Sequence, residues 1–405
     1  MRILIITQYF WPESFRINDI CLGLKERGYE IVVLTGKPNY PTGKFYEGYS
    51  FNSSDKETWN GIEIYRSRLI PRGEGGGVLL FLNYISFAFF ASLKVFFINR
   101  KFDRIFVYEP SPITVGIPAI VAKIKFKSPI YFWVQDLWPE SISAAGGVKN
   151  KFVISILDSI TQFIYKQSKI ILVQSLAFKP YINAQNVGME KIVYFPNSTE
   201  SYYQIQAKNP KYKNRIPSGF NLIFAGNIGE AQSFDTLLEA AFLLKKENIP
   251  INWIILGDGR AKEYVKRKIS DLYLESNFIL LGSFPSTEMP YFFSCADALL
   301  VSLKKDKIFS FTIPAKVQSY LACGKPIIGS LDGEGARIII EANAGFSAQS
   351  ENYIALADCV RKMYNLSDEE RMLFARNARN YFEQEFEREM LLDKLESILD
   401  NDLTK

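Results

Sequence analysis

The sequence predicts an α/β protein with two doubly wound parallel sheets in series. Along most of the chain, apolar runs of strand length alternate with longer segments of helical period, a pattern typical of a parallel sheet covered by helices on both faces. The alternation stops at a polar, turn-rich stretch near residue 200 and then starts again. A chain of 405 residues is also long enough for two domains, each with its own core.

The first domain is expected to span residues 1–200. It opens with a strand at 3–7 and a helix at 18–27 that ends at Gly28. The later predicted elements are strands at 31–34, 104–108, 130–135, 169–174 and 191–194, and helices at 112–125, 153–166 and 176–186. Parallel strands of this kind place their carboxyl ends, and therefore their ligands, at one edge of the sheet.

A linker is expected at 201–219, within the polar stretch "FPNSTESYYQIQAKNPKYKNRIPSG". The second domain is expected at 220–380, and a helical tail at 381–405 is expected to pack back on the first domain. The predicted elements of the second domain are strands at 222–225, 252–256, 278–281, 298–302 and 326–330, and helices at 234–246, 261–270, 287–295, 315–322 and 336–342, with a last helical stretch from 367 to about 401. Two such domains predict a central cleft between them, with a ligand across the carboxyl ends of both sheets.

Val78–Ile98 departs from the alternation because it is almost long enough to span a bilayer, which takes about 20 apolar residues. Asn83, Ser86 and Lys94 fall close to one helical stripe, and a polar stripe suits a helix that lies on a surface. Three alternatives stay open: a core or domain-interface helix, a membrane-surface helix, and a true membrane span. The basic residues that follow the segment favour docking on an anionic membrane; they are Arg100, Lys101 and Arg104.

Composition excludes several classes of function. The net charge of +5 is too small for a dedicated nucleic-acid binder, but it suits a protein that meets phosphate or anionic lipid. The chain has no histidine, the commonest general base and metal ligand at neutral pH, so we expect no metal site. The four cysteines show no metal-ligand spacing and should pack as small apolar side chains in a reducing compartment. The start "MRILIITQYF" is typical of a strand rather than a secretory signal, which predicts a cytoplasmic protein.

Three glycine-containing loops follow strands of the second domain: "FAGNIGEAQSFD" at 224–235, "LGDGRA" at 256–261 and "GEGA" at 333–336. Each puts backbone N–H groups and a helix start at the carboxyl edge of the sheet, where the helix dipole favours an anion. Together they predict a diphosphate cradle, although any one of them could be an ordinary turn. The expected donor contacts in these loops are Gly226, Asn227, Gly229, Gly257, Gly259, Gly333, Glu334 and Gly335.

Two basic residues are candidates for the same diphosphate. Lys316 follows Pro314 at the start of a predicted helix and can add positive charge to the cradle, unless it is a solvated helix lysine. Arg16, in "WPESFRIND" after the first strand, can contribute from the first domain, unless it forms a surface salt bridge.

In the first domain, "FWVQDLWPES" places Gln135, Asp136 and Glu140 after an almost wholly apolar strand. They therefore emerge at the carboxyl end of the sheet, where a doubly wound fold binds its ligands. Glu109, in "VYEPSP", ends a neighbouring strand. We expect these four residues at the acceptor or the donor sugar, with a capping role in a turn as the alternative for Asp136 and Glu109.

Five motifs cover nearly the whole chain: "ITQYFWPE", "LTGKPNYPTGKFYEGY", "VQDLWPES", "GNIGEAQ" and "PAKVQSYLACGKPIIGSLDGEGA". In this combination the chain resembles a family 4 retaining glycosyltransferase of the GT-B fold, in which two Rossmann-like domains face a central cleft. Within that family it is similar to the bacterial subgroup that includes L-fucosamine transferases of O-antigen and capsule assembly. The resemblance implies a nucleotide-sugar donor held mainly by the second domain and an acceptor held mainly by the first.

The chain departs from the family pattern at several positions. Two glutamates common in relatives are replaced by Phe311 and Ser319, and a basic pair is replaced by Asn227 and Gln232. The histidine usual before Asp136 is Gln135. In a retaining transfer the leaving diphosphate can itself take the acceptor's proton, so activity does not require these groups.

The resemblance and the residues together give the candidate site. Asp136, Lys316 and Arg16 are the expected catalytic residues, since the protein must position the substrates and stabilise developing phosphate charge. Gln318, beside the vacant glutamate position Ser319, can bind a ribose or sugar hydroxyl.

The loss of the histidine also bears on the donor sugar, because that residue commonly approaches the C6 hydroxyl in relatives. We therefore expect a 6-deoxy donor, first of all UDP-N-acetyl-L-fucosamine, with its methyl on apolar surface from Trp133, Leu137 and Trp138. The alternative is that Gln135 binds a C6 hydroxyl as a neutral amide.

The expected function is transfer of this sugar to an undecaprenyl-diphosphate-linked saccharide at the inner face of the plasma membrane, with no cofactor besides the nucleotide-sugar substrate. A non-catalytic member of a glycosyltransferase complex is the main alternative. A sugar-nucleotide epimerase is less favoured because such enzymes generally use titratable groups that include histidine. A nicotinamide dehydrogenase is weaker still, since "ITQYFWPESF" lacks the required glycines.

Overall fold

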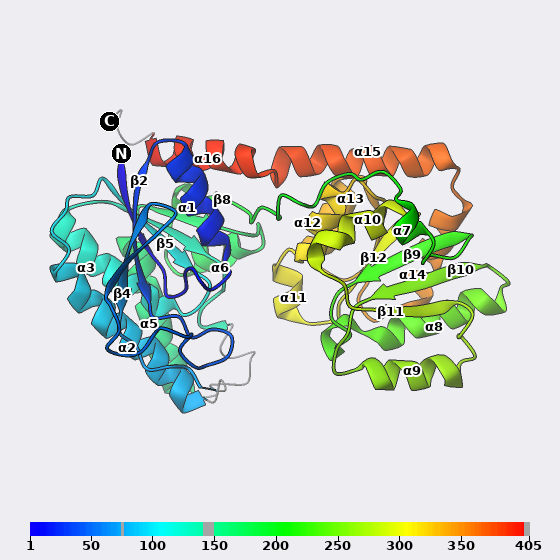
Figure 1. Ribbon diagram of the computed structural model, residues 1–405, viewed down its shortest axis with the longest axis horizontal. Helices are drawn as coiled ribbons and strands as arrows, with labels where there is room; N and C mark the ends of the chain where they lie inside the picture. Colours follow the sequence, from blue (N-terminus) through cyan, green and yellow to red (C-terminus); the bar gives the residue numbers. More distant parts are fainter. Residues whose placement is uncertain (74–76, 141–149, 401–405) are drawn as a thin grey trace. The chain divides into compact units, whose positions relative to one another are not determined.

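The computed structural model describes residues 1–73, 77–140 and 150–400. These residues form two compact α/β units, each with a sheet flanked by helices (Figure 1). Unit 1 comprises Met1–Asn197 and the chain from Leu392 onward, and unit 2 comprises Ser198–Leu391. The predicted fold class is confirmed.

Unit 1 is built on an eight-stranded sheet in the order β3-β4-β2-β1-β5-β6-β7-β8. Its strands are β1 (Arg2–Ile6), β2 (Glu30–Gly36), β3 (Lys56–Trp59), β4 (Ile62–Ser67), β5 (Arg104–Glu109), β6 (Ile130–Val134), β7 (Ile170–Val173) and β8 (Ile192–Tyr194). The neighbours are parallel except β3, which pairs antiparallel with β4 at the edge. The prediction missed both of these strands, since β3 alternates between exposed and half-buried residues and has no apolar run.

The central strands of unit 1 are buried on both faces, as in other doubly wound sheets. The helices of this unit are α1 (Arg16–Glu26), α2 (Gly77–Phe96), α3 (Gly116–Phe126), α5 (Lys151–Gln167) and α6 (Phe178–Ala184), with short 3-10 turns at Ile113–Val115 and Met189–Lys191. Because the strands are parallel, Glu109, Gln135 and Asp136 emerge at the same edge of the sheet.

The polar stripe of α2 faces the protein, and the apolar side of the helix is exposed. Asn83 donates to Ile70 O and accepts from Gln8 Nε2, each at 2.6 Å, and Lys94 pairs with Asp55 at 2.6 Å. The exposed side chains are Val78, Leu79, Phe81, Leu82, Ile85, Phe89, Leu93 and Phe96. The stripe faces inward because its polar groups satisfy buried partners from neighbouring segments. Among the described residues, α2 is also the helix that is long and apolar enough to cross a membrane.

Unit 2 contains a fully parallel six-stranded sheet in the order β11-β10-β9-β12-β13-β14. Its strands are β9 (Phe220–Ala225), β10 (Ile251–Leu256), β11 (Phe278–Gly282), β12 (Ala298–Ser302), β13 (Ile327–Ser330) and β14 (Gly345–Ala348). Its helices are α7 (Pro210–Lys213), α8 (Phe234–Lys246), α9 (Lys262–Asp271), α10 (Met289–Ser294), α11 (Lys307–Phe311), α12 (Ala315–Ala322), α13 (Glu334–Glu341), α14 (Tyr353–Asn365) and α15 (Asp368–Glu385), with 3-10 turns at Glu230–Gln232 and Ser286–Glu288. The side chains of α8, α9 and α14 form one core cluster with alternate residues of the strands.

The segment predicted as a linker at 201–219 belongs to unit 2 and is partly ordered by packing. It contains α7, and Tyr212 of that helix is buried and stacks on Tyr291, with ring centroids 5.2 Å apart and planes at 8°. The sequence stretch is polar overall, so this anchor is visible only in the tertiary contacts.

The predicted last helical stretch is divided into α15 and α16 (Arg388–Asp400). The chain joins unit 1 at Leu392, whereas the sequence analysis began the tail at residue 381. There Arg27 of α1 pairs with Asp393 and Glu396, and Arg104 Nε donates to Leu399 O at 3.0 Å. The last five predicted tail residues, 401–405, lie outside the described residues.

Candidate active site

A cavity of about 330 Å³ lies at the carboxyl edge of the unit 2 sheet. It is formed by the ends of β9, β10 and β11 together with α10, α12 and the segment before α7. The residues that line it are Tyr203, Ala225, Gly226, Asn227, Leu256, Gly257, Asp258, Ser283, Phe284, Ser286, Met289, Phe293, Lys316, Ser319 and Tyr320. Two of the three predicted glycine loops therefore meet at one cavity.

Glycine is required where these two loops cross. Gly226 and Gly257 have φ of +147° and +156°, in the region that side chains disfavour. A Cβ on Gly257 would lie 1.8 Å from Gly226 O, and a Cβ on Gly226 would lie 2.4 Å from Cε of Lys316. The absence of side chains thus allows the two backbones and Lys316 to approach one another at the cavity wall.

Lys316, the second residue of α12, is a half-buried lysine in the wall of this cavity. Its Nζ lies 3.9 Å from the ring centroid of Phe224, and burial lowers the pKa of Lys316 to about 7. Among the described residues, no carboxylate lies within ion-pair distance of Lys316, and Asp258 across the cavity is paired with Lys262 at 2.7 Å. An ammonium in this setting is stabilised by an incoming anion.

Asn227 and Gln232, which stand where relatives carry a basic pair, are polar residues of the first loop. Asn227 is exposed at the cavity wall. With its nitrogen turned toward them, the amide of Gln232 donates to the carbonyl oxygens of Gly229 and Asn227, each at 3.2 Å. A Cβ on Gly259 would lie 2.3 Å from Ile228 O, so this glycine also permits a close loop crossing. Gly229 and Gly259 support the loops but do not line the cavity.

The residues around the vacant glutamate positions differ in their placement. Ser319 lines the cavity, and its Oγ donates to Lys316 O at 3.0 Å. Gln318 is 4% exposed and lies outside the cavity wall, because it is on the inner side of α12. Phe311 ends α11 and is also outside the wall. The structure thus gives no support to Gln318 as a ligand group in this cavity.

The third predicted loop lies at a different groove of unit 2. Gly333 lines a groove of about 450 Å³ next to α13 and β14, together with Arg337 and Glu341. Glu334 is buried and pairs with Arg337 at 3.0 Å. A Cβ on Gly335 would lie 2.4 Å from a methyl carbon of Leu331, so this position serves close packing. Two of the three predicted loops therefore share a cavity and the third does not, and binding of a diphosphate there stays a prediction.

The sequence analysis missed the aromatic wall of the cavity. Tyr203 stacks on Phe293 with ring centroids 6.3 Å apart and planes at 10°, and Phe284 follows β11. The turn "GSFPS" at 282–286 after a strand was an available signal for the Phe284 side. No local signal marks Tyr203, which comes from the stretch that reads as a linker.

In unit 1 the predicted residues gather at the carboxyl edge of the sheet. Burial raises the pKa of Tyr108, the carboxyl groups of Asp136 and Glu109 raise it further, and Arg16 acts in the opposite direction. Arg16, Glu109 and Asp136 therefore lie near enough to the Tyr108 hydroxyl to act on it electrostatically. Glu140 lies close enough to Tyr165 to influence its titration, as does Glu109.

The two carboxyl groups at this edge differ in burial. Burial, and then the carboxylate of Asp136, raises the pKa of Glu109 well above its ordinary value. Burial raises the pKa of Asp136 to about 6. Glu109 is therefore the group of the pair that more readily holds a proton, which relieves the repulsion between the two carboxyl groups.

Three side chains proposed as a surface for a C6 methyl group do not provide one. Trp133 is fully buried and its Nε1 donates to Phe195 O at 3.0 Å. Leu137 and Trp138 are 6% and 4% exposed. Strand β6 is covered on both faces, and the turn after it exposes too little apolar surface for a methyl group, so the structure gives no support to this expectation.

Glu13 is a structural carboxyl that the sequence analysis did not single out. Its oxygens accept from the backbone N–H groups of Phe10 at 3.3 Å, Asn39 at 2.8 Å and Tyr40 at 2.7 Å. Burial raises the pKa of Glu13 to about 7. This residue ties the loop after β1 to the loop after β2, so it shapes the same edge of the sheet.

Two comparisons by sequence cover most of the chain. Residues 14–198 match the family described as Glycosyl transferase 4-like domain, and residues 206–381 match the family described as Glycosyl transferases group 1. WbjE of Pseudomonas aeruginosa, named as a probable glycosyltransferase, is 24% identical over 324 residues, which cover 78% of this chain and 77% of WbjE. WcaI of Escherichia coli (strain K12), whose name assigns it as a glycosyl transferase to colanic acid biosynthesis, is 23% identical over 375 residues, which cover 89% of this chain and 88% of WcaI.

Solved structures with the same fold include HepE of Anabaena in complex with UDP and the sucrose-phosphate synthase of Thermosynechococcus elongatus. HepE superposes with a TM-score of 0.68 at 13% identity, covering 99% of this chain and 100% of HepE. The synthase superposes with a TM-score of 0.70 at 14% identity, covering 100% of this chain and 99% of the synthase. With both halves of the sequence matched, the chain belongs to the glycosyltransferases of the GT-B type, with a 4-like domain first and a group 1 domain second.

Proposed function

We propose that the protein is a retaining glycosyltransferase of surface-polysaccharide assembly, which moves a sugar from a UDP-linked donor to an undecaprenyl-diphosphate-linked saccharide. The observation that carries the proposal is the unit 2 cavity, where Lys316 has no carboxylate partner among the described residues. A diphosphate in that cavity would supply the missing negative charge. The role in polysaccharide assembly is supported by the relative WcaI, named for colanic acid biosynthesis.

The proposed chemistry needs no histidine. The bond between the anomeric carbon and the donor diphosphate breaks, and the acceptor oxygen forms its bond to that carbon on the same face. The acceptor's proton passes to an oxygen of the leaving diphosphate. Lys316 and the backbone N–H groups near Gly226 and Gly257 stabilise the charge that develops there. Arg16 and Asp136 are proposed to position the acceptor from unit 1.

The direct test is incubation of the purified protein with a panel of nucleotide sugars and a short lipid-diphosphate saccharide, with products identified by mass spectrometry. Transfer of one sugar is expected, and its anomeric configuration in the product should match that of the donor. Nucleotide binding without transfer or hydrolysis of any donor would favour the non-catalytic alternative, to which the vacant positions Phe311 and Ser319 point.

We also propose that the transfer requires no metal ion or other cofactor, because Lys316 and backbone N–H groups take the part of a cation at the diphosphate. Activity should therefore persist in excess chelator. Loss of activity in chelator, with recovery on addition of magnesium or manganese, would contradict this assignment.

The proposed donor sugar is N-acetyl-L-fucosamine or a related 6-deoxyaminohexose. The support is the resemblance to the L-fucosamine transferase subgroup and the replacement of a histidine by Gln135. Better turnover of UDP-N-acetylglucosamine or UDP-galactose than of any 6-deoxy donor would rule this sugar out and leave the broader transferase function standing.

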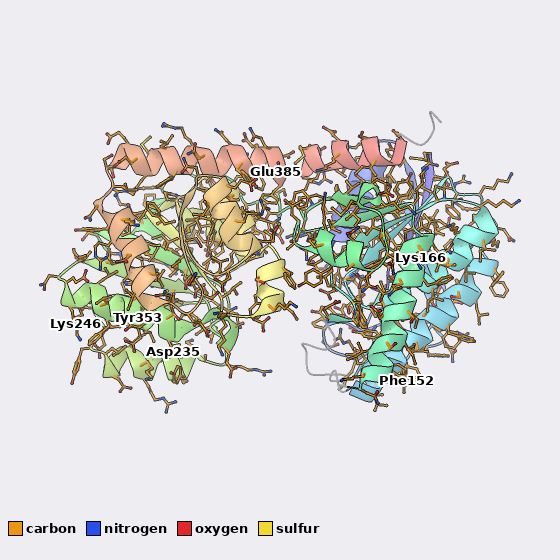
Figure 2. The ribbon with its side chains drawn as sticks, turned by 180° about the vertical axis from the view of Figure 1, so that it is seen from behind. Phe152, Lys166, Asp235, Lys246, Tyr353 and Glu385 are labelled. Atoms are coloured by element: carbon orange, nitrogen blue, oxygen red, sulfur yellow. The ribbon has the colours of Figure 1, made fainter. Side chains whose placement is uncertain are left out.

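We propose further that unit 1 docks on the anionic inner face of the plasma membrane through α2 and α5. On α2, Val78 and Phe81 are 75% and 59% exposed, and on α5, Phe152 and Phe163 are 73% and 54% exposed. Figure 2 labels Phe152 and Lys166 near the two ends of α5. An apolar face of this size with basic residues beside it suits a membrane interface. The exposed lysines around these helices are Lys101, Lys127, Lys151, Lys166 and Lys169.

Helix α3 holds these two helices in one layer. Lys125 donates to the carbonyl oxygens of Val95, Phe96 and Ile98 at the end of α2, at 2.8–3.1 Å. Lys123 donates to Gln167 O at the end of α5, at 2.7 Å. The apolar faces of α2 and α5 therefore move as one surface.

Flotation with anionic liposomes tests the docking. Phe81→Ser and Phe89→Ser together should reduce the floated fraction, whereas Tyr273→Ser, at an even more exposed aromatic side chain of unit 2, should not. If the unaltered protein stays in solution at low salt, the membrane-docking proposal is wrong. The transferase assignment is not affected by that result.

A further inference from the structure

Three carboxamide side chains meet at the carboxyl edge of the unit 1 sheet. Gln135 directly follows β6, Gln174 directly follows β7, and Asn197 lies just beyond β8. Gln174 Nε2 donates to Gln135 O at 2.9 Å, and Asn197 Nδ2 donates to Gln135 Oε1 at 2.8 Å and to Gln174 Oε1 at 3.4 Å. The three amides thus form one connected network across the ends of three strands.

The network determines which way the amide of Gln135 is turned. A backbone carbonyl is always an acceptor, so the contact with Gln135 O requires the nitrogen of Gln174 on that side. The side-chain oxygen of Gln174 then faces Asn197, so Asn197 must turn its Nδ2 toward Gln174. The same nitrogen meets the side-chain oxygen of Gln135, so Nε2 of Gln135 is turned away from the network.

This outward nitrogen has no partner among the described residues. Gln135 is 7% exposed, and its Nε2 is a buried donor without an acceptor. Trp138, three residues later in the same turn, carries a second such donor at Nε1. Buried donors in folded proteins are nearly always satisfied by protein, water or ligand. Two unsatisfied donors in one turn therefore indicate that an acceptor atom from outside the described residues belongs here, and a bound ligand is one source of it.

The charges around the turn restrict what that acceptor is. Asp136 lies between the two donors in the sequence, and Glu109 lies close to Asp136. An anionic ligand such as phosphate would be repelled by the Asp136 carboxylate, whereas a neutral oxygen would not. Neutral oxygens that accept hydrogen bonds are plentiful in a carbohydrate: hydroxyl groups, the ring oxygen and the carbonyl of an N-acetyl group.

We propose that Gln135 is a dedicated hydrogen-bond donor to a neutral oxygen of the sugar substrate, and that Gln174 and Asn197 are positioning residues that keep its nitrogen turned outward. The assignment rests on the proposed transferase function and adds a rule of specificity to it. A C6 methyl group cannot satisfy Nε2, so a 6-deoxyaminohexose would meet Gln135 through another oxygen, such as its N-acetyl carbonyl.

The test compares three substitutions at Gln135. Gln135→Glu keeps the size and the contact with Asn197 but replaces the donor by an acceptor, Gln135→Met removes both, and Gln135→His restores a donor. The first two should lower kcat/KM for the sugar donor by about 10- to 100-fold, the cost of leaving a buried polar partner unpaired, and Gln135→His should recover most of it. UDP affinity should not change, because the cavity of Lys316 belongs to unit 2.

Asn197→Asp tests the positioning role. A carboxylate cannot donate, so the Gln135 amide should turn its nitrogen toward residue 197 and present its oxygen outward. The result should resemble Gln135→Glu in kcat/KM while UDP affinity stays constant. Gln185→Met is the matched control, since Gln185 is a part-buried amide of the same unit at the opposite end of α6.

Binding of the same sugars is also followed by the intrinsic fluorescence of the five tryptophans, which needs no turnover, and the part of the signal lost in Trp138→Phe is assigned to this turn. If no nucleotide sugar is turned over by the unaltered protein, the proposed function fails, and the fluorescence titrations still decide whether Gln135 binds sugar. If Gln135→Glu and Gln135→Met change only the melting temperature, with kcat/KM and sugar binding within about twofold of the unaltered protein, Nε2 meets a buried water and the inference is overturned.

Discussion

The carboxyl edges of the two sheets carry ionisable side chains of opposite charge type. In unit 2, the half-buried Lys316 lies among glycine backbone and aromatic rings, and burial lowers the pKa of Lys316 to about 7. In unit 1, two neighbouring carboxyl groups, Glu109 and Asp136, are buried, and their pKa values are raised. One edge is therefore prepared for an anion, and the other for neutral groups that donate and accept hydrogen bonds.

This difference explains how a glycosyltransferase site can lose the family's usual charged residues. The anion edge relies on one lysine whose charge is strengthened by the ligand itself, instead of several surface cations. Under the proposed function, the unit 1 edge relies on the oriented amide of Gln135 and on the carboxyl group of Glu109, whose pKa is raised by burial. The predictions below test the two edges separately.

The largest effect is expected from the loop crossing in unit 2. Gly257→Ala places a Cβ 1.8 Å from Gly226 O at a φ of +156°, so the two loops must separate. UDP binding should fall below detection, and the free energy of unfolding should drop by about 1–3 kcal/mol. Calorimetric titration and urea unfolding measure the two effects.

Gly28→Ala is the control for this change. Gly28 also has a positive φ, of +89°, but a Cβ there would meet no atom within 4 Å. It should cost only the backbone strain, about 1–2 kcal/mol, and leave UDP binding intact. Equal loss of UDP binding in both variants would mean that general destabilisation, not the crossing, is responsible.

Removal of the Lys316 charge is expected to have the next largest effect. Lys316→Met should weaken UDP-sugar binding by about 1.5–3 kcal/mol, the range for a hydrogen bond to a charged group. The matched control is Lys325→Met, because Lys325 is another half-buried lysine of unit 2 whose Nζ donates to the carbonyl oxygens of Ser294 and Ala296. Loss of affinity in Lys325→Met but not in Lys316→Met would mean that the diphosphate does not bind at the start of α12.

The pH dependence of donor binding should follow from the lowered pKa of Lys316. The free protein loses this proton near pH 7, and a bound diphosphate favours the charged form, so binding above pH 7 takes up a proton. Affinity for a UDP-sugar should be constant below pH 7 and weaken by up to about tenfold per pH unit above it. Asp258 faces the same cavity, but its pairing with Lys262 lowers its pKa, and burial raises the pKa of Tyr320.

Titration calorimetry in two buffers of different ionisation enthalpy measures the proton uptake directly. In Lys316→Arg the guanidinium stays charged throughout, so both the uptake and the pH dependence should disappear. A pH dependence that survives this substitution would assign the proton to another group.

The smallest effect is expected from Glu109, at the carboxyl edge of the unit 1 sheet, on the pH dependence of stability. The unfolded chain loses the Glu109 proton near pH 4.5, whereas the folded protein retains it to higher pH, so this group lowers stability as pH rises from 4.5 to 7. The amide introduced by Glu109→Gln cannot titrate, so the difference in free energy of unfolding between variant and unaltered protein should shift in favour of the variant over that range. Urea unfolding at several pH values measures the shift, and Glu239→Gln, at an exposed carboxyl on α8, should show none of it. A constant difference across the range would mean that Glu109 is ionised in the folded protein.

Local sequence patterns were sufficient to predict the fold and some of the residues that line the unit 2 cavity. The alternation of apolar runs predicted the two parallel sheets, since strand and helix periods depend only on neighbouring residues. Gly226, Gly257 and Lys316 could be assigned to one site because parallel strands always bring their carboxyl ends to one edge. The same rule predicted that Glu109, Gln135 and Asp136 would lie together.

The features that the sequence analysis missed or placed wrongly depend on partners far away in the chain. The edge strand β3 is defined by pairing with β4, and Tyr203 reaches the cavity only because it packs on Phe293. The third glycine loop could not be separated from the other two, because all three follow parallel strands and differ only in what packs beside them.

The sequence by itself determined the two-sheet architecture, the glycine loops and the lysine of the unit 2 cavity, because these follow from local periodicity and from the common direction of parallel strands. The tertiary structure alone decided which way polar groups turn: the stripe of α2 faces inward, and the amide of Gln135 presents its nitrogen outward. The physical reason is that a polar side chain is oriented by the partner that satisfies it, and for both groups that partner comes from a distant segment of the chain.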